Sequence, residues 1–461
     1  MTREDGTPTS TRASNPPPRR RPFSLGLAIL GLAALSYLLG AAAMFFELPT
    51  SGLLAKAFIG ARAWNERRQA AARISGHELP PVARGAIDKP GKTFDGFTLC
   101  TYASMSTSST QAFLLNMRRE VVHKWAISFS EIWPHPPHVE GPVDDALVCF
   151  FGCHLYPNGD LLVVLHGLQQ STNGYGLVKL DKDSHVLWSY AAKVHHDVDV
   201  AEDGTIYAIQ HEMVDDMPKG LEAIPTPCMV DSLAVLSPDG KLLKKPIPIL
   251  EALRDSPYSA LLAALERPAK TSAPPGLPVS RLVDDARQRD ALHTNFVQVL
   301  TRQLAPKFPR FKPGQVLISM RHLDAIAVMD PQRGSVVWAA RGPWRGQHDV
   351  QFLDNGHLLL FDNLGSPRGS RVLEYDPQTQ AFPWSYSGEN RGPFFSEQRG
   401  MSQRLPNGNT LIVNSQGGEI LEVTAAKEVV WTCSFDAFIH VGRRYSPDQL
   451  PFLNGGQRAR P

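Results

Sequence analysis

One pattern occurs twice in this chain and constrains its fold more than any other feature. In each copy a His-Asp pair opens a strand pattern, a turn ending in glycine follows, and a second apolar run comes next. The first copy runs from His195-His196-Asp197 to Gly204 and beyond, and the second runs from His348-Asp349 past Gly356. A repeated supersecondary unit is typical of folds that copy one element around an axis. Histidines at matching places could therefore face one shared centre.

Further hairpins extend this repeat along the chain. Most contain Asp-Pro, Asp-Gly or a similar turn former, which accepts the backbone angles of a tight hairpin. Five of the hairpins end at a tryptophan, namely Trp125, Trp188, Trp338, Trp384 and Trp431. A degenerate copy without tryptophan begins at Ala234. Second turns follow at Pro157–Gly159, Glu202–Gly204, Lys312–Gly314, Asp354–Gly356 and Pro406–Gly408. The chain is therefore a series of short hairpins.

Four strands of about five residues in each unit of about 35 to 55 residues predict an all-β fold, a six-bladed β-propeller over residues 96–450. The last unit is short of strands after Trp431. We expect the run Gly96–Tyr102 to close the ring by pairing beside the strand that ends at Trp431, because open edges would otherwise remain. A β-sandwich or two stacked domains are the alternatives. Residues 451–461 are expected to form a tail.

A helical insertion of about residues 246–313 is expected within one unit. Its segments Ile249–Arg254 and Tyr258–Glu266 space their apolar residues as a helix does. Pro268–Pro278 is rich in proline and is expected to be irregular. His293 lies near the end of the insertion, so the helical part could form a rim or lid over a site.

The N-terminal region predicts a membrane anchor. Residues 1–22 have a disordered composition, and residues 23–46 contain no charged side chain. A helix of about 24 residues is roughly 36 Å long, enough to cross a bilayer core. The basic run Arg19–Arg21 precedes it, which puts the N-terminus in the cytoplasm. A helical or irregular linker of residues 47–95 would follow. A cleaved signal peptide ending near Ala41–Ala43 is the alternative.

Charge and cysteine content exclude some classes of function. The formal net charge of the 461 residues is +2, which gives no electrostatic footprint for nucleic acid. Five cysteines leave at least one unpaired. Cys149 and Cys153 are near neighbours, and Cys100 could meet Cys433 if the ring closes as expected, but the sequence does not fix any pairing. No Cys-X-X-Cys pattern for zinc is present.

Four polar segments are the candidates for chemistry. In a propeller the innermost strand of each blade begins near the central channel, so residues at these places can meet. The segments are His196-Asp197, His293-Thr-Asn295, Ser319-Met-Arg321-His322 and Gln347-His348-Asp349. The competing interpretation is that these histidines are packed channel residues that hold the blades together by hydrogen bonds.

Together with Phe361-Asp-Asn363 and Arg368–Arg371, these segments make the chain from about residue 110 to 450 resemble the bacterial arylsulfate sulfotransferases. The resemblance implies a six-bladed propeller that uses no nucleotide donor and no other cofactor or metal. Members of that family move a sulfuryl group from a phenolic sulfate ester to a phenolic acceptor. Their mechanism is ping-pong and passes through a sulfohistidine. Both partners would be small molecules.

The resemblance also implies roles for single residues. His348 matches the family nucleophile, and Arg321 matches the arginine that binds the sulfate. His293 and Asn295 match the pair that contacts the sulfuryl oxygens, and His196 matches the remaining ligand, with His195 as its ambiguous neighbour. Asp349 or a backbone carbonyl could fix the tautomer of the nucleophile. Either His196 or His293 could move the proton of the phenol.

The chain departs from the family in its N-terminal region, because familiar members are soluble and carry a separate β-domain there. We expect a single-pass protein of the bacterial inner membrane with its propeller in the periplasm. The physiological substrates and the oligomeric state stay open, with a homodimer as one option. Two other function classes also stay open. One is a propeller enzyme that depends on a quinone or a metal, and the other is a non-catalytic scaffold in the cell envelope.

Overall fold

The computed structural model describes position 36 and residues 84–103, 110–139, 143–167, 174–265, 290–367, 369–389, 391 and 394–456, with the side chains of 454–456 left out. The chain divides into two compact units, 1–72 and 73–461. Everything below concerns the second unit. Apart from Ser36, the predicted membrane segment 23–46 lies outside the described residues. No helix in the described ranges is long and apolar enough to cross a membrane.

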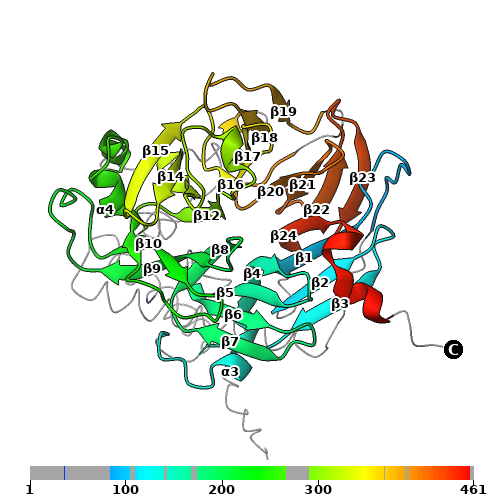
Figure 1. The fold of residues 1–461 in the computed structure, drawn as a ribbon, viewed down its shortest axis with the longest axis horizontal. Helices are drawn as coiled ribbons and strands as arrows, with labels where there is room; N and C mark the ends of the chain where they lie inside the picture. The colour runs from blue at the N-terminus through cyan, green and yellow to red at the C-terminus, as the bar shows by residue number, and fades with distance from the viewer. Residues whose placement is uncertain are drawn as a thin grey trace, which may run out of the picture. The chain divides into compact units, whose positions relative to one another are not determined.

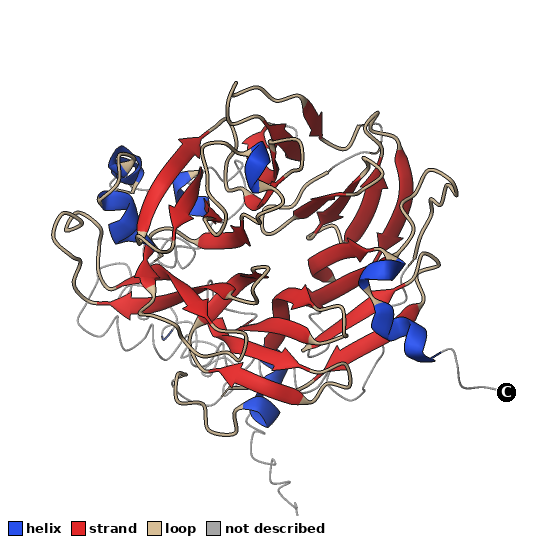
Figure 2. Ribbon diagram, in the orientation of Figure 1, coloured by secondary structure: helices blue, strands red, loops and turns tan. Residues whose placement is uncertain are grey.

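Six four-stranded antiparallel sheets stand around a central axis, which confirms the all-β, six-bladed propeller (Figures 1 and 2). The first blade joins β24 (Phe438–Tyr445) to β1 (Phe97–Ala103), β2 (Gln111–Leu115) and β3 (Val121–Ala126). The second has β4 (Val148–Leu155), β5 (Leu161–Gly167), β6 (Gly174–Leu180) and β7 (Val186–Tyr190). The third has β8 (Val194–Val200), β9 (Ile206–Val214), β10 (Cys228–Leu236) and β11 (Ile247–Pro248).

The other three blades follow in chain order. The fourth has β12 (Thr294–Val299), β13 (Val316–Met320), β14 (Ala325–Asp330) and β15 (Ser335–Arg341). The fifth has β16 (His348–Phe352), β17 (Leu358–Ser366), β18 (Gly369–Tyr375) and β19 (Trp384–Tyr386). The sixth has β20 (Met401–Arg404), β21 (Thr410–Asn414), β22 (Glu419–Val423) and β23 (Val429–Ser434). The inner strands β4, β8, β12, β16, β20 and β24 contact one another in turn around the axis.

Short helices connect or flank the blades. They are α3 (Phe129–Ile132), α4 (Ile249–Arg254) and the 3₁₀ turns η1 (Asp145–Leu147), η2 (Ser259–Ala264), η3 (Ala305–Lys307), η4 (Arg321–Leu323), η5 (Pro447–Gln449) and η6 (Pro451–Gly456). Helix α4 and η2 lie where the insertion was expected to be helical. The expected irregular stretch Pro268–Pro278 lies outside the described residues. Strand β12 already begins at Thr294, so the last part of the expected insertion belongs to the fourth blade.

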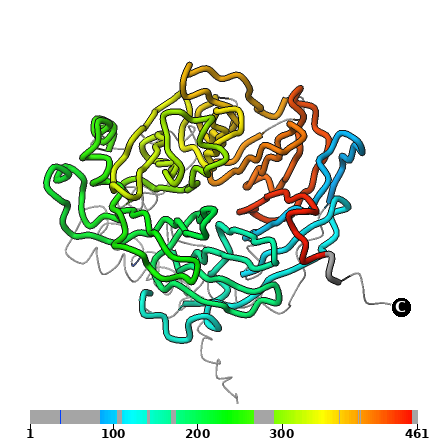
Figure 3. The backbone as a smooth tube through the Cα atoms, viewed as in Figure 1, coloured from blue at the N-terminus to red at the C-terminus, as the bar shows by residue number. Residues whose placement is uncertain are grey.

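The ring closes through β1 as predicted. The prediction that β1 pairs beside the strand ending at Trp431 was wrong. Strand β1 pairs antiparallel with β24, with Cys100 opposite Gly442, and with β2 on its other side. The strand ending near Trp431, β23, completes the sixth blade and pairs outward with the short segment around Arg84 and Asp88. The sequence pattern missed β24 because only Phe435, Asp436 and Ala437 separate it from β23, without a glycine or proline. Figure 3 shows the N-terminal and C-terminal strands side by side in one sheet.

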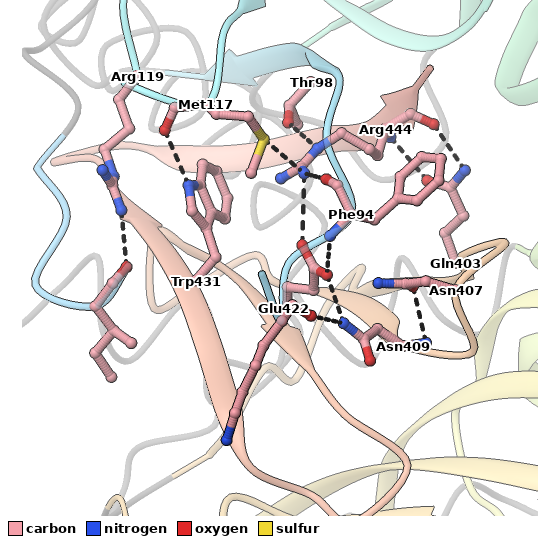
Figure 4. A network of polar contacts seen from close by, with 12 residues as sticks. Phe94, Thr98, Met117, Arg119, Gln403, Asn407, Asn409, Glu422, Trp431 and Arg444 are labelled. Carbon is pink, nitrogen blue, oxygen red and sulfur yellow. Dashed lines mark hydrogen bonds and ion pairs between the residues drawn. The ribbon is translucent and has the colours of Figure 1, made fainter. Parts of the chain in front are cut away.

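A buried polar network fastens this closure to the sixth blade (Figure 4). The Arg444 guanidinium donates to Thr98 Oγ1 at 2.8 Å and to the Phe94 carbonyl at 2.6 Å. It also lies 3.5 Å from Glu422, and neither side chain is exposed. Glu422 Oε1 accepts from the Phe94 amide and from Asn409 Nδ2, each at 2.7 Å. The segment leading into β1 is therefore held by a paired buried charge as well as by strand pairing.

All five cysteines are buried and none forms a disulfide. Cys100 and Cys433 both belong to one apolar cluster, which includes residues of the first, second and sixth blades. Burial and the neighbouring Cys433 raise the pKa of Cys100 well above its ordinary value. These thiols therefore act as small apolar side chains in the core.

We predict that Glu422→Ala destabilises the propeller strongly, because it leaves the Arg444 charge buried without a partner. Breaking such a pair typically lowers the free energy of unfolding by about 3–5 kcal/mol. Chemical unfolding followed by tryptophan fluorescence measures this change. Glu428→Ala is the matched control, since Glu428 pairs with Lys89 and Lys92 at the surface, where ion pairs contribute little. Equal losses in the two variants would contradict a role for the buried pair.

Candidate active site

The inner strands begin with irregular backbone. His196, His293, Asp349 and Arg399, each at or next to the start of an inner strand, have φ values of 60°, 50°, 50° and 59°. Residues other than glycine rarely adopt this left-handed conformation, and it is enriched at functional sites. Strand pairing is also shifted near the starts of β8, β12 and β16. Such bulges turn side chains away from the regular pleat, here near the axis.

The two copies of the His-Asp pattern differ by one residue at this bulge. In β8, the three residue steps from His195 to Val198 lie opposite one step on β9, from Ile209 to Ala208. In β16, the three steps from His348 to Gln351 lie opposite two steps on β17, from Phe361 to Leu359. By its distance in sequence from the following turn glycine, His196 is the residue that matches His348. By its pairing partner on the neighbouring strand, His195 is the residue that matches His348. The extra residue in β8 explains why the sequence left His195 and His196 ambiguous.

His195 and His196 have different surroundings. His195 is fully buried, and its Nε2 lies 3.3 Å from Asp231 Oδ1, an ion-pair contact without hydrogen-bond geometry. The His196 ring centroid lies 4.9 Å from that of His293. On its other side, His196 Nδ1 lies 2.6 Å from Nδ1 of His195. His196 therefore meets the other candidates, and His195 stands behind it.

The side chain of His348 is held in one tautomer. Its Nδ1 lies 2.9 Å from Asn363 Oδ1 and 3.1 Å from the Gly346 carbonyl oxygen. The Asn363 amide is oriented because its Nδ2 donates to the carbonyls of Ser396 and Arg399. Two acceptors require a proton on Nδ1, so the lone pair of His348 resides on Nε2. A backbone carbonyl takes part as expected, but Asn363 rather than Asp349 is its side-chain partner.

The pKa of His348 lies well below its ordinary value. Burial is the main cause, followed by the charge of Arg321, and the hydrogen bond to Asn363 opposes the shift. Asp349 instead accepts from the Ser402 amide and from Gln351. A neutral imidazole with a fixed Nε2 lone pair is suited to nucleophilic attack at neutral pH.

The structure brings the predicted site residues together. The Arg321 amide donates to the His293 carbonyl at 3.2 Å, and the charge of Arg321 acts on His348. Asn295 Nδ2 donates to the carbonyl of Gln347 at 2.9 Å, directly before His348. Asn295 and His348 also line one small cavity. With the contact between His196 and His293, the five residues form one connected group.

Arg399 also belongs to this group, although the sequence did not point to it. It lines the same cavity as His348, and its guanidinium stacks over Phe151 at 3.6 Å. Its Nη2 donates to the His440 carbonyl, and its buried Nε has no hydrogen-bond partner among the described residues. Burial lowers the pKa of Arg399 to about 10. Its place in the repeat was the available signal, because it precedes Gly408 by as many residues as His195 precedes Gly204.

Two carboxylates near Arg399, those of Asp197 and Asp349, interact with another arginine, Arg443. Arg443 Nη2 lies 3.7 Å from Asp349 Oδ1, and Asp349 and Asp197 raise the pKa of Arg443. No ion pair within 4.0 Å joins Arg399 to a carboxylate in the described part of the chain. A buried guanidinium in this position favours a small anion.

The cavity beside His348 is small, whereas a larger pocket lies nearby. The first has a volume of about 10 Å³ and the second about 500 Å³. The larger one is lined by Asp324 and residues 341–345, which lead into Gly346. The smaller cavity is near the size of one water molecule, so a sulfuryl group enters only if side chains around it move.

One cluster of three side chains could hold a metal ion. Ligand atoms of Asp290, His293 and His322 lie within 4.8 Å of one another. Asp290 Oδ2 is 2.7 Å from His293 Nδ1, and the Asp290 carbonyl is 2.7 Å from His322 Nδ1. These distances are those of hydrogen bonds, so the groups already satisfy one another as a buried Asp–His arrangement.

Comparison with known proteins identifies a family that this chain matches. A family model described as "Arylsulfotransferase (ASST)" matches residues 153–436. None of the curated proteins in the comparison matches. A solved Bacteroides caccae protein of unknown function covers 73% of this chain over 93% of its own, with 13% identity and a TM-score of 0.42. A streptogramin B lyase covers 77% over 84% of its own, with 11% identity and a TM-score of 0.40. Likeness at this level says nothing about activity.

We predict a pH-dependent gain in stability from Asp197→Asn. Burial raises the pKa of Asp197 to about 7, whereas the unfolded value is near 3.9. The folded state therefore keeps a proton that the unfolded state releases, so the wild type loses stability as pH rises from about 4 to 7. Thermal unfolding should show a higher Tm for the variant at pH 8 and none of that gain at pH 4. The control is Asp203→Asn in an exposed turn, which should show no such gain. A gain in Asp197→Asn that is the same at both pH values would contradict the assignment.

Proposed function

Because the chain belongs to the arylsulfotransferase family, we propose that it moves a sulfuryl group from a phenolic sulfate ester to a phenolic acceptor through a sulfated His348. The observation that carries this proposal is the environment of His348. Its Nδ1 is held by Asn363 and Gly346, and its pKa is lowered. The ring thus offers Nε2 as a neutral, oriented nucleophile. A covalent intermediate divides one difficult displacement into two easier ones.

In the first step, His348 Nε2 attacks sulfur and the bond from sulfur to the phenolic oxygen breaks. Charge on the three sulfuryl oxygens needs donors, and the site offers the guanidinium of Arg321 and the second amide hydrogen of Asn295. Arg399 adds a buried positive charge beside the same cavity. Fixed donors of this kind stabilise charge that develops in the transition state.

In the second step, the oxygen of the acceptor phenol attacks sulfur and the S–N bond breaks. The electron pair of that bond returns to His348 Nε2. The departing phenolate of the first step needs a proton, and the acceptor of the second step must lose one. His196 and His293 stand together beside the site, so either could give the proton in one step and take it in the other.

The place of the reaction in the cell is a further part of this proposal. The uncharged segment 23–46, preceded by Arg19–Arg21, supports a chain anchored in the bacterial inner membrane with the propeller in the periplasm. The donor and acceptor would then be small phenolic compounds of that compartment.

The first experiment is turnover of 4-nitrophenyl sulfate with and without added phenol. A sulfotransferase releases nitrophenol continuously only when phenol is present, and its two-substrate kinetics give parallel double-reciprocal lines. Loss of turnover on chelation would favour a metal-dependent propeller enzyme. Absence of turnover with every ester tested would favour a scaffold.

We predict that His348→Ala abolishes turnover and leaves the fold intact, because one buried ring adds little to six packed blades. Arg321→Ala should retain weak activity, since it stabilises charge without forming the bond. Losing one such donor typically costs about 10²–10³ in rate. Steady-state kinetics and circular dichroism measure both effects. Full activity in His348→Ala would contradict the assignment of the nucleophile.

We predict that Arg399→Met raises the KM for the donor and weakens inhibition by inorganic sulfate by about tenfold or more. Methionine keeps an unbranched side chain over Phe151 but removes the charge. Arg399→Lys should recover part of the effect. Arg119→Met is the matched control, because Arg119 stacks on Trp431 at 5.2 Å in the outer part of the ring. Unchanged sulfate inhibition in Arg399→Met would show that the guanidinium serves packing alone.

A further inference from the structure

The buried carboxylates behind His196 and His293 distinguish these two histidines. We propose that Asp290 is a positioning residue that holds His293 through Nδ1 and makes His293 Nε2, rather than a nitrogen of His196, the atom that gives and takes the proton of the phenol. This inference rests on the proposed sulfuryl transfer and assigns the acid–base group within it.

Asp290 holds His293 at two points. Its Oδ2 lies 2.7 Å from His293 Nδ1, and its Oδ1 accepts the His293 backbone amide at 3.0 Å. Asp290 is itself fixed, because it bridges to Met229 of β10 and its carbonyl accepts from His322 Nδ1 at 2.7 Å. It is 1% exposed, so water does not compete for the carboxylate. The His293 ring therefore has a set orientation.

This contact decides which nitrogen of His293 can exchange a proton. A carboxylate accepts only, so Nδ1 carries a hydrogen and the lone pair resides on Nε2. When Nε2 takes a second proton, the adjacent carboxylate stabilises the imidazolium, as it does in catalytic triads. His293 also lies beside the other site groups, since its ring is 4.9 Å from that of His196 and its carbonyl accepts from the Arg321 amide.

His196 is held differently. The carboxylate on its side of the site is Asp231, and Asp231 Oδ1 lies 3.3 Å from Nε2 of His195. Nδ1 of His195 in turn lies 2.6 Å from His196 Nδ1. The partner of His196 Nδ1 is thus a second imidazole, whereas the partner of His293 Nδ1 is a carboxylate.

An imidazole partner stabilises an imidazolium less well than a carboxylate does. Burial, followed by the charges of His293 and His195, holds the pKa of His196 well below its ordinary value. His196 therefore does not take up the proton of the phenol. The two neighbouring histidines thus have different roles that their sequence motifs do not reveal.

The proton balances over both steps. The cycle begins with His293 as the imidazolium, whose charge Asp290 pairs. In the first step, His348 Nε2 bonds to sulfur, the S–O bond breaks, and the proton on His293 Nε2 passes to the leaving phenolate, which leaves a lone pair on Nε2. In the second, the acceptor phenol returns a proton to His293 Nε2 as its oxygen bonds to sulfur and the S–N bond breaks. His293 and His348 are then in their starting states.

Asp290→Asn tests this assignment because it reverses the tautomer of His293. The asparagine oxygen must keep accepting the His293 backbone amide, which cannot change its polarity. The new NH₂ group then faces Nδ1, which becomes an acceptor, and Nε2 becomes a fixed donor. The variant therefore keeps the size and the backbone contact of Asp290 but removes the exchangeable lone pair.

The measurement is single-turnover sulfation by two donors, 4-nitrophenyl sulfate and unsubstituted phenyl sulfate. Nitrophenolate leaves without a proton, so Asp290→Asn should change its rate only a few-fold. Unsubstituted phenolate needs a proton to leave, so the rate of sulfation by phenyl sulfate should fall by about 10²–10⁴ in this variant. Asp199→Asn is the matched control, because Asp199 accepts the Val299 amide at 2.8 Å and belongs to no site histidine pair. His196→Gln should slow both donors by the same factor.

Equal loss with both donors in Asp290→Asn would overturn the inference and leave a purely structural role for Asp290. A difference between donors that appears in His196→Gln would move the acid–base role to His196. Loss of wild-type activity on chelation, restored by zinc, would assign Asp290, His293 and His322 to a metal and also overturn it. A wild type that reacts with neither donor would instead contradict the proposed function itself.

Discussion

Antiparallel pairing of β1 with β24 is the constraint on which the rest of the structure depends. Strand β24 comes from the end of the chain and β1 from its beginning, and together they form one blade with β2 and β3. The buried pair of Arg444 and Glu422 joins this blade to the sixth. Only a closed ring brings the starts of all six inner strands to one axis. The histidines of the third, fourth and fifth blades meet because the first blade is complete.

Much of this architecture was predictable, since turn formers recur along the chain and five of the six blades have a tryptophan. The partner of β1 was not, because β24 follows β23 without a glycine or proline turn. Matching places in the repeat pointed to His196, His293 and His348, and the family resemblance added roles for Asn295 and Arg321. Asn363 had appeared only as part of a motif, and its role depends on amide hydrogen bonds to two carbonyls. Asp290 lies only three residues before His293, but its role depends on a contact of its carboxylate with Nδ1 that no motif marks. Arg399 was missed because no histidine marks its copy of the repeat.

Electrostatics give the site its chemical character. Burial and the guanidinium of Arg321 keep His348 neutral. Arg399 brings a second positive charge, while Asp349 lies 3.7 Å from Arg443. In the proposed reaction an anionic ester would thus meet a site that favours its charge and offers an uncharged nucleophile. Behind this site, the carboxylate on His293 and the imidazole on His196 separate the proposed roles of the two histidines.

The central claim is that His348 becomes sulfated, and the most direct measurement is the mass of the protein after incubation with donor ester and no acceptor. Peptide mapping should place one sulfuryl group on the peptide containing His348, and added phenol should remove it. The His348→Ala variant should gain no mass. A sulfuryl group that persists in that variant, or turnover by the wild type with no modified peptide at any time, would contradict the account.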